Sequence, residues 1–144
     1  MKKEILPAVS AIIFNENREV LLQRRKDTKK WCVISGHVEF GESVEEAMIR
    51  EVMEETNVRS EVVRLIGVYS LPVYTTYYYP DRTVQYVVTY FEVRLKDSIQ
   101  QGLTNSESEE FAYFPADQLP QETDLMNPNW LADALDVNAG VFIR

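Results

Sequence analysis

The chain has 144 residues, of which 45% are hydrophobic, so it is long enough for one domain with a single core. Its net charge of −8 at pH 7 disfavours non-specific binding to nucleic acid, because polyanions repel it at long range. The chain has no run of about 20 apolar residues, so we expect no membrane span. A single cysteine excludes an internal disulfide and, together with an opening segment that lacks the apolar core of a signal peptide, suits a reducing cytoplasm.

The first part of the chain predicts short strands joined by charged turns. Residues 8–14 are apolar and rich in strand formers, and residues 15–18, with the sequence NENR, are typical of a hairpin turn. Residues 19–24 are then expected to return as a second strand. A charged loop at residues 26–30 leads into a short apolar segment at residues 31–34.

A helix is predicted over residues 44–56, after a loop at residues 36–42. Ser43 followed by Glu46 forms a capping box at its start. Asn57 is expected to end the helix, because asparagine tolerates the left-handed backbone conformation. The opposite side of the helix from its acidic residues is expected to pack on the core and consists of Val44, Met48, Ile49, Val52 and Met53.

The rest of the chain predicts three more strands and a final helix. Residues 61–69 form one strand, and residues 83–95 form a central strand because both of its faces are apolar. Residues 111–114 are the last short strand. Three segments connect or follow these strands: a tyrosine-rich loop or irregular hairpin arm at residues 71–81, a polar loop at residues 97–110, and a tight helical turn at residues 115–120. The final helix is expected to begin with Asn127 as its cap and Pro128 at its first position. This order favours an α/β fold, with a mixed sheet between helical layers in one domain over residues 1–144.

The strongest chemical signal lies in the acidic residues of the predicted helix. Glu51, Glu54 and Glu55 fall within roughly 100° of one another at 3.6 residues per turn. Carboxylates so close repel each other unless water or a cation separates them, and Mg²⁺ or Mn²⁺ prefers such oxygen ligands. Glutamate-rich helix faces are usually solvated surface, but this one lacks the interspersed lysines of such a surface. The pattern therefore predicts a divalent metal site.

Residues 36–58 resemble the Nudix box. That family's pattern is Gly, five residues, Glu, seven residues, Arg-Glu, an aliphatic residue, any residue, Glu-Glu, any residue, Gly, and an aliphatic residue. Asn57 replaces the last glycine, and the fixed positions that match are Gly36, Glu42, Arg50, Glu51, Glu54, Glu55 and the aliphatic residues. The resemblance extends less specifically over nearly the whole chain. It implies a Nudix-type α/β/α sandwich around a mixed β-sheet.

The resemblance also implies a reaction, which is the metal-dependent hydrolysis of a diphosphate bond in a nucleoside diphosphate linked to another group. A nucleoside monophosphate is the product. Arg50 and Glu42 are expected to pair and lock the loop onto the helix, since an arginine fork suits this bidentate contact. Glu51 is either a metal ligand or the general base. The ligands for Mg²⁺ or Mn²⁺ would come from the Ser35 carbonyl, Glu51, Glu54, Glu55 and a later loop acid, with Glu107 as first choice and Glu109 as second.

Five residues are candidate contacts for the nucleotide. Arg24 or Arg25 would meet its phosphates, Gly36 and His37 lie at the start of the box, and Tyr86 belongs to a tyrosine-rich group that could stack on a base. Each candidate has an ordinary alternative: surface charge for the arginines, a structural hydrogen bond for the histidine, and core packing or a homodimer contact for the tyrosines.

Two other functions stay open. A Nudix-like domain can sense a nucleotide without cleaving it, although the intact Arg50, Glu51, Glu54 and Glu55 disfavour that reading. An isomerase of prenyl diphosphates shares the fold, and Cys32 just before the box makes it worth naming, but the chain looks short for it. The box does not identify which nucleotide is the substrate.

Overall fold

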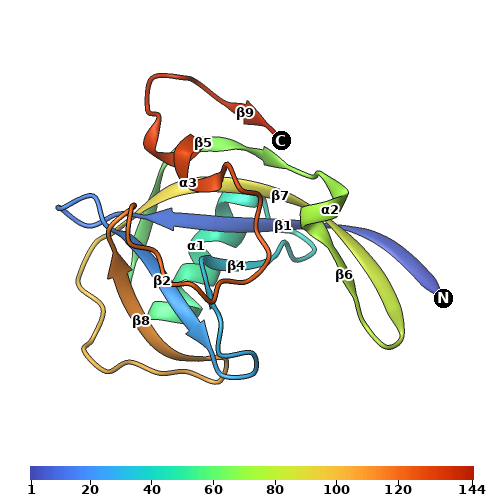
Figure 1. The fold of residues 1–144 in the computed structure, drawn as a ribbon, viewed down its shortest axis with the longest axis horizontal. Coiled ribbons are helices and arrows are strands. Elements are labelled where there is room, and N and C mark those ends of the chain that lie inside the picture. The colour runs from blue at the N-terminus through green and yellow to red at the C-terminus, as the bar shows by residue number, and fades with distance from the viewer.

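A mixed sheet forms the centre of the protein in this computed structural model, which describes residues 1–144. Its strands are β1 (Lys2–Ile13), β4 (Ile34–His37), β5 (Ser60–Tyr69), β6 (Thr76–Tyr78), β7 (Arg82–Leu95) and β9 (Phe142–Ile143). The order is β4-β1-β7-β5-β9, and β6 pairs with β7 as a hairpin (Figure 1). Strands β1 and β7 run parallel along their whole shared length, and the other pairs except β5–β9 are antiparallel.

A smaller antiparallel sheet stands beside the first. It contains β2 (Val20–Arg25), β3 (Trp31–Cys32) and β8 (Ser108–Phe114) in the order β3-β2-β8. The helices are α1 (Val44–Thr56), α2 (Pro72–Thr75) and α3 (Trp130–Leu135). None of them is long and apolar enough to cross a bilayer.

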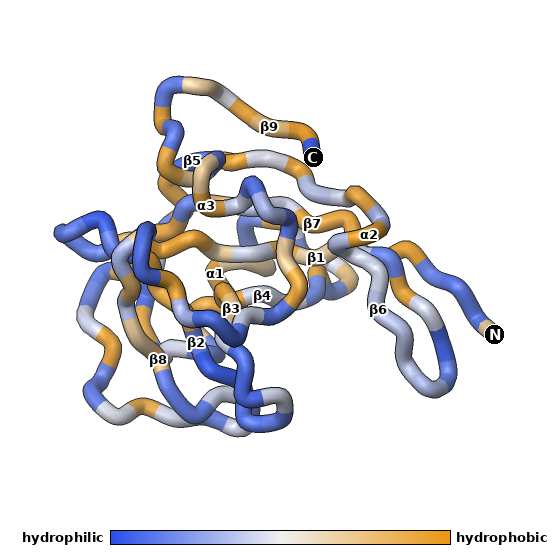
Figure 2. Tube along the Cα trace, viewed as in Figure 1, coloured by the Kyte–Doolittle hydropathy of each residue, from blue (hydrophilic) through white to orange (hydrophobic).

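The core has two halves, one on each face of the central sheet. On one face, Met48 and Val52 of α1 pack against Val9 and Phe91. On the other face, side chains of α3 pack against the strands, including Trp130, Leu131, Ala134, Ile12, Ile66 and Tyr69. Figure 2 shows the apolar segments gathered where β1, β7 and these helices meet, while the peripheral loops are hydrophilic. The predicted α/β/α sandwich is therefore confirmed.

The prediction of a central strand at residues 83–95 is confirmed, because β7 lies between β1 and β5 and buries Tyr90 on one face and Phe91 on the other. The prediction of a β1–β2 hairpin is wrong. The turn at residues 15–18 forms, with Arg18 donating its N–H to the Asn15 carbonyl, but only the single bridge Phe14–Val20 joins the two arms. After that bridge β2 enters the small sheet. Pairing with β7 also extends β1 to Lys2, six residues earlier than predicted.

The C-terminal third differs most from the sequence prediction. Strand β8 begins at Ser108 rather than residue 111, and β9 follows it, so residues 111–114 are not the last strand. Residues 115–120 form a turn without a helix. Helix α3 begins at Trp130, because Asn127 instead closes the preceding turn by accepting the N–H of Asn129. In the middle of the chain, residues 71–81 were predicted as a loop or an irregular hairpin arm, and the hairpin arm forms, with α2 at its start and β6 paired with β7.

Helix α1 matches its predicted bounds and both predicted caps. The Ser43–Glu46 capping box is complete, and Asn57 has the left-handed backbone angles φ 60° and ψ 25°. Its apolar face is narrower than predicted: Met48 and Val52 are buried, whereas Val44 and Met53 are exposed. The acidic residues also do not share one exposed face, because Glu55 is buried.

Candidate active site

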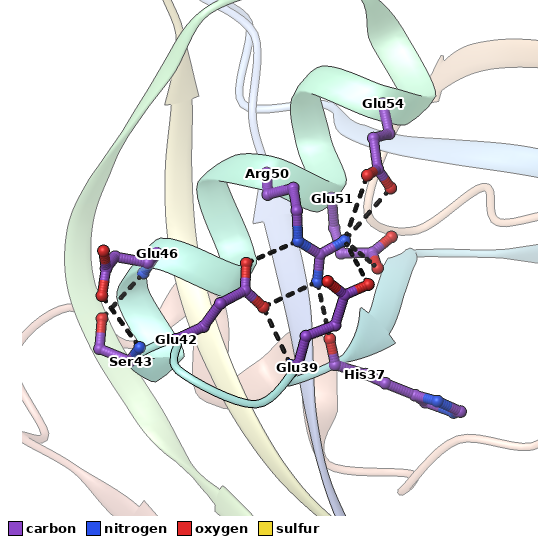
Figure 3. A network of polar contacts seen from close by, with 8 residues as sticks. All are labelled: His37, Glu39, Glu42, Ser43, Glu46, Arg50, Glu51 and Glu54. Carbon is purple, nitrogen blue, oxygen red and sulfur yellow. Dashed lines mark hydrogen bonds and ion pairs between the residues drawn. The ribbon is translucent and has the colours of Figure 1, made fainter.

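The guanidinium of Arg50 lies at the centre of the acidic cluster (Figure 3). Its Nε and Nη2 donate to the two carboxylate oxygens of Glu42 at 2.6 and 3.0 Å, and Nη2 also donates to the His37 carbonyl at 3.0 Å. Its Nη1 donates to Glu51 at 3.0 Å and to Glu54 at 3.2 Å. One side chain thus ties the loop at residues 36–42 to α1. The predicted pairing of Glu42 with Arg50 is present.

The same contacts shift the ionisation of the loop carboxyl. The hydrogen bond from Arg50 lowers the pKa of Glu42, and the backbone N–H of Glu39 lowers it further through a 2.9 Å bond. In return the Glu42 carboxylate raises the pKa of Arg50. Opposite charges within hydrogen-bonding distance stabilise the charged form of both groups, so this pair stays ionised over the physiological range.

Gly36 is required by the close passage of β4 past α1. A Cβ atom at this position would overlap the carboxyl end of Glu51. Burial raises the pKa of Glu51, and the hydrogen bond from Arg50 opposes that rise. The first glycine of the box therefore lets β4 approach close enough to hold the Glu51 carboxyl against the strand.

A second carboxyl pair, Glu55 and Glu107, lies near Glu51, with Glu55 one turn further along α1. Burial raises the pKa of Glu55 to about 7; Asn105, which donates to its side chain at 2.9 Å, lowers it, and the neighbouring Glu107 raises it. Glu107 is held by its backbone, since its N–H donates to the Asn105 side chain and its carbonyl accepts from Lys26. Glu109, the second choice for a loop ligand, instead contacts Lys29 and Arg24.

The candidate metal ligands are of the chemical type that a hard divalent cation prefers. Glu51, Glu54, Glu55 and Glu107 offer only carboxylate oxygens, which Mg²⁺ and Mn²⁺ prefer. Burial raises the pKa of Glu51 and Glu55 by more than their contacts with Arg50 and Asn105 lower it, and a nearby cation would oppose that rise. No three acidic, histidine or cysteine side chains are grouped closely enough to hold a metal as they stand, and the Arg50 guanidinium occupies the space between Glu51 and Glu54.

A cavity of about 240 Å³ opens beside the start of the box. Six of the predicted site residues line it: Arg25, Ser35, Gly36, His37, Tyr86 and Glu107. Tyrosines form much of the wall and comprise Tyr69, Tyr74, Tyr77, Tyr79, Tyr86 and Tyr90. The cavity therefore joins a charged end, at the box, to an aromatic end.

The two candidate arginines are separated by the structure. Arg25 lines the cavity, where Asp27 accepts two hydrogen bonds from it at 2.9 and 2.8 Å. Arg24 does not line it, and instead contacts Glu109 and Glu110 on the small sheet. Neighbouring residues on β2 point to opposite sides, so only one of the two can face the cavity.

His37 and Tyr86 meet at the boundary between the two ends of the cavity. The His37 Nε2 and the Tyr86 hydroxyl are 3.1 Å apart, and the Tyr86 hydroxyl is 3.2 Å from that of Tyr79. The backbone carbonyl of His37 meanwhile faces Arg50. His37 thus connects the acidic cluster to the tyrosine wall.

Comparison with known proteins agrees with this site. A family model described as the NUDIX domain matches residues 4–134. The chain belongs to the Nudix family. Two curated relatives are a putative 8-oxo-dGTP diphosphatase of Bacillus subtilis (strain 168), 44% identical over 61 residues, and an ADP-ribose pyrophosphatase of Methanocaldococcus jannaschii, 45% identical over 67 residues.

These alignments are partial. They cover 42% and 45% of this chain, and the chain spans only 41% and 40% of the two relatives. A crystal structure of a UDP-X diphosphatase superposes with a TM-score of 0.76 over 96% of this chain and 66% of the other, at 23% identity. At that identity the superposition supports the Nudix fold alone.

Two groups of residues at this site were not found by sequence reasoning. Asn105, which binds Glu55, lies 50 positions away in a polar loop and carries no local signal. Asp124 and Asn127 reach the cavity from the segment before α3. Burial raises the pKa of the Cys32 thiol to about 12, so this residue remains a neutral thiol and gives no support to the prenyl diphosphate isomerase reading.

Proposed function

We propose that this Nudix protein hydrolyses a diphosphate bond in a nucleoside diphosphate linked to another group and releases a nucleoside monophosphate. The observation that carries the proposal is the Arg50-centred cluster, which holds Glu42, Glu51 and Glu54 together at the charged end of a cavity large enough for part of a nucleotide. The names of the two curated relatives, a diphosphatase and a pyrophosphatase, support the same reaction class.

Mg²⁺ or Mn²⁺ is the proposed cofactor, held by Glu51, Glu54, Glu55, Glu107 and the Ser35 carbonyl. When bound, such an ion neutralises charge on the diphosphate and makes a coordinated water more acidic. The protein supplies the positioning: Arg50 orients Glu51 and Glu54, and Asn105 fixes Glu55. Glu51, half-buried against Gly36, is either a further ligand or the base that accepts a proton from the attacking water.

The substrate would contact the residues that line the cavity. Gly36 and His37 would lie beside the diphosphate, and Arg25 would exchange its contact with Asp27 for one with a phosphate. Tyr86 would lie between the diphosphate and the nucleoside, since it contacts His37 on one side and Tyr79 on the other.

The test is a panel of nucleotides incubated with Mg²⁺ and, separately, Mn²⁺. The panel contains nucleoside triphosphates, ADP-ribose, sugar nucleotides, dinucleoside polyphosphates and capped RNA. We expect at least one compound to release a nucleoside monophosphate. Binding of nucleotides without turnover of any compound would favour the sensor alternative, and no uptake of either metal by calorimetry would remove the metal site.

A variant pair makes the test specific to the cluster. Glu54→Gln should lower turnover by about two orders of magnitude or more while the fold survives, because a charged group that acts on the transition state is lost. Glu45→Gln is the matched control, since Glu45 lies on the same helix, is exposed and makes no side-chain hydrogen bond. Full activity in Glu54→Gln would refute the metal assignment.

A homodimer is the proposed oligomeric state. Strand β4 covers β1 only at Ala8–Ala11, so the edge of residues 2–6 has no neighbouring strand on that side. An uncovered edge readily pairs with a strand of a second copy. Light scattering should give twice the 16.7 kDa mass of the chain, and a monomer at all concentrations tested would exclude the dimer.

A further inference from the structure

Two tyrosine rings on the arm side of the cavity lie nearly parallel to each other. The ring centroids of Tyr77 and Tyr79 are 6.5 Å apart, with an angle of 18° between the ring planes. Both rings line the cavity and remain 38% and 37% exposed. Tyr78, between them on the chain, is 81% exposed and does not line the cavity.

The spacing follows from the geometry of an extended chain. A strand rises about 3.3 Å per residue, so side chains two residues apart on one face are about 6.6 Å apart. Carbon atoms in favourable contact are about 3.5 Å apart, so a flat ring between two others needs about 7 Å. The distance of 6.5 Å between the ring centroids of Tyr77 and Tyr79 is within about half an ångström of that value.

Contacts hold each ring of this pair in place. The Tyr79 hydroxyl is 3.2 Å from the Tyr86 hydroxyl, which also meets His37. The Arg82 guanidinium lies over the Tyr79 ring, 5.5 Å from its centroid. The Tyr86 ring lies edge-on to Tyr77 at 5.5 Å and 70°. Val84, directly across the hairpin from Tyr77, is fully buried.

The position of the pair relative to the box gives it a role. His37 lies 5.3 Å from Tyr86 between ring centroids, and Tyr86 lies 5.5 Å from Tyr77, so the three aromatic residues lead from the box to the paired rings. The arm itself is the β6–β7 hairpin, which extends from the body of the protein beside the first half of β1 (Figure 1).

We propose that Tyr77 and Tyr79 clamp the base of the substrate nucleotide between their rings. The proposal rests on the proposed function, and it names the part of the substrate that the arm recognises. Every base presents a flat π-face, so stacking accepts purines and pyrimidines alike. The substrate class is therefore a nucleoside diphosphate derivative. Its base is required for binding, but the clamp discriminates only weakly between one base and another.

The experiment measures equilibrium binding by calorimetry in the presence of Mg²⁺, with ADP, UDP and inorganic pyrophosphate as probes. Tyr77→Leu and Tyr79→Leu should each weaken ADP and UDP binding about tenfold, because loss of a stacking side chain removes a contact of that size. Binding of pyrophosphate, which has no base, should not change. Tyr78→Leu is the control on the same strand and should bind all three probes like the wild type.

Two further variants separate stacking from folding and from the hydroxyl contacts. Tyr77→Phe and Tyr79→Phe retain the ring and should keep the wild-type affinity for ADP. The clamp is refuted if Tyr77→Leu binds ADP normally, if pyrophosphate binding falls as much as ADP binding, or if only one of ADP and UDP is affected. Because binding is measured without turnover, these outcomes do not depend on whether the chain hydrolyses any compound in the panel.

Discussion

The two walls of the cavity are built on different principles. The box wall consists of Gly36 and His37, which line the cavity, and of the rest of the loop at residues 36–42 with α1 behind them. It is charged, and Arg50 alone donates to Glu42, Glu51, Glu54 and the His37 carbonyl. The arm wall, formed by β6 and β7, is aromatic and holds its rings in place with the hydroxyl contacts of Tyr79 and Tyr86.

This contrast separates two kinds of sensitivity. Charged contacts depend on exact distance and on ionisation, so small changes in the box wall should act mainly on turnover. Ring contacts are broad and tolerate small shifts, so changes in the arm wall should act mainly on nucleotide affinity. The largest effects on turnover and stability should therefore come from changes in the box wall.

After Glu54→Gln, the largest effect on turnover is expected for Arg50→Lys. A lysine keeps the charge but has one compact ammonium group, so it cannot bind both oxygens of Glu42 and the His37 carbonyl at once. Turnover should fall about 100-fold, because misplacing catalytic groups by about 1 Å has an effect of that order. Steady-state kinetics on the best substrate of the panel measures it. Arg59→Lys, at an exposed arginine without an ion pair, should be silent, and more than half the wild-type turnover in Arg50→Lys would contradict the proposed positioning role.

Gly36→Ala should have the next largest effect. Its Cβ would overlap the Glu51 carboxyl, so either the side chain or β4 must move. We expect turnover to fall about tenfold and the free energy of unfolding to fall by about 1–3 kcal/mol, as for overpacking elsewhere. In a double-mutant cycle, Gly36→Ala should cost less stability when Glu51 is already alanine. If urea unfolding shows that the stability losses of Gly36→Ala and of the alanine variant of Glu51 simply add, the overlap with the Glu51 carboxyl is not the cause of the destabilisation.

The local features of the box could be predicted because their causes lie within a few residues. The capping box needs only Ser43 and Glu46, the helix stop needs only Asn57, and the Arg50–Glu42 pair spans one loop. The burial of Glu55 on the same helix was not predicted, because its cause lies far away in the sequence. Glu55 is buried because the loop before β8 packs on it, with Asn105 as its partner, and nothing near Glu55 in the sequence indicates that loop.

Long-range pairing explains the errors in the fold as well. The turn at residues 15–18 is a good hairpin turn, yet β1 finds a longer partner in β7 and β2 finds one in β8. Asn127 and Pro128 have the right residue types to start a helix, but the Asn127 side chain satisfies a turn N–H first. In both places the local sequence favours the predicted element, but a competing contact, distant in one case and neighbouring in the other, decides the structure.

A smaller effect, on stability alone, is expected at the end of α1. Asn57 has φ 60°, a conformation that costs a residue with an ordinary Cβ about 1–2 kcal/mol and that asparagine tolerates better. Asn57→Ala should therefore lower the free energy of unfolding by about 1 kcal/mol, and Asn57→Gly should not lower it. Urea titration measures both variants. Since Asn57 does not line the cavity, turnover should be unchanged, and a loss of activity in Asn57→Gly would mean that the asparagine side chain has a role of its own.

The smallest effect is the pH dependence of the link between the loop and the helix. Arg50 lowers the pKa of Glu42 in the folded protein, so the pair stabilises the fold above the ordinary carboxyl pKa and loses that stabilisation as the pH falls through the lowered value. The difference in unfolding free energy between the wild type and Glu42→Gln should thus be constant from pH 7 to about pH 5 and shrink at lower pH. Urea titrations across this range measure it, with Glu16→Gln at an exposed, unpaired loop glutamate as control.

The effect should be small because both side chains are partly exposed, and it should fade in high salt. A difference that grows on acidification would have the opposite sign and would mean that Glu42 contributes to the fold in its protonated form, so that Arg50 is not its main partner in solution.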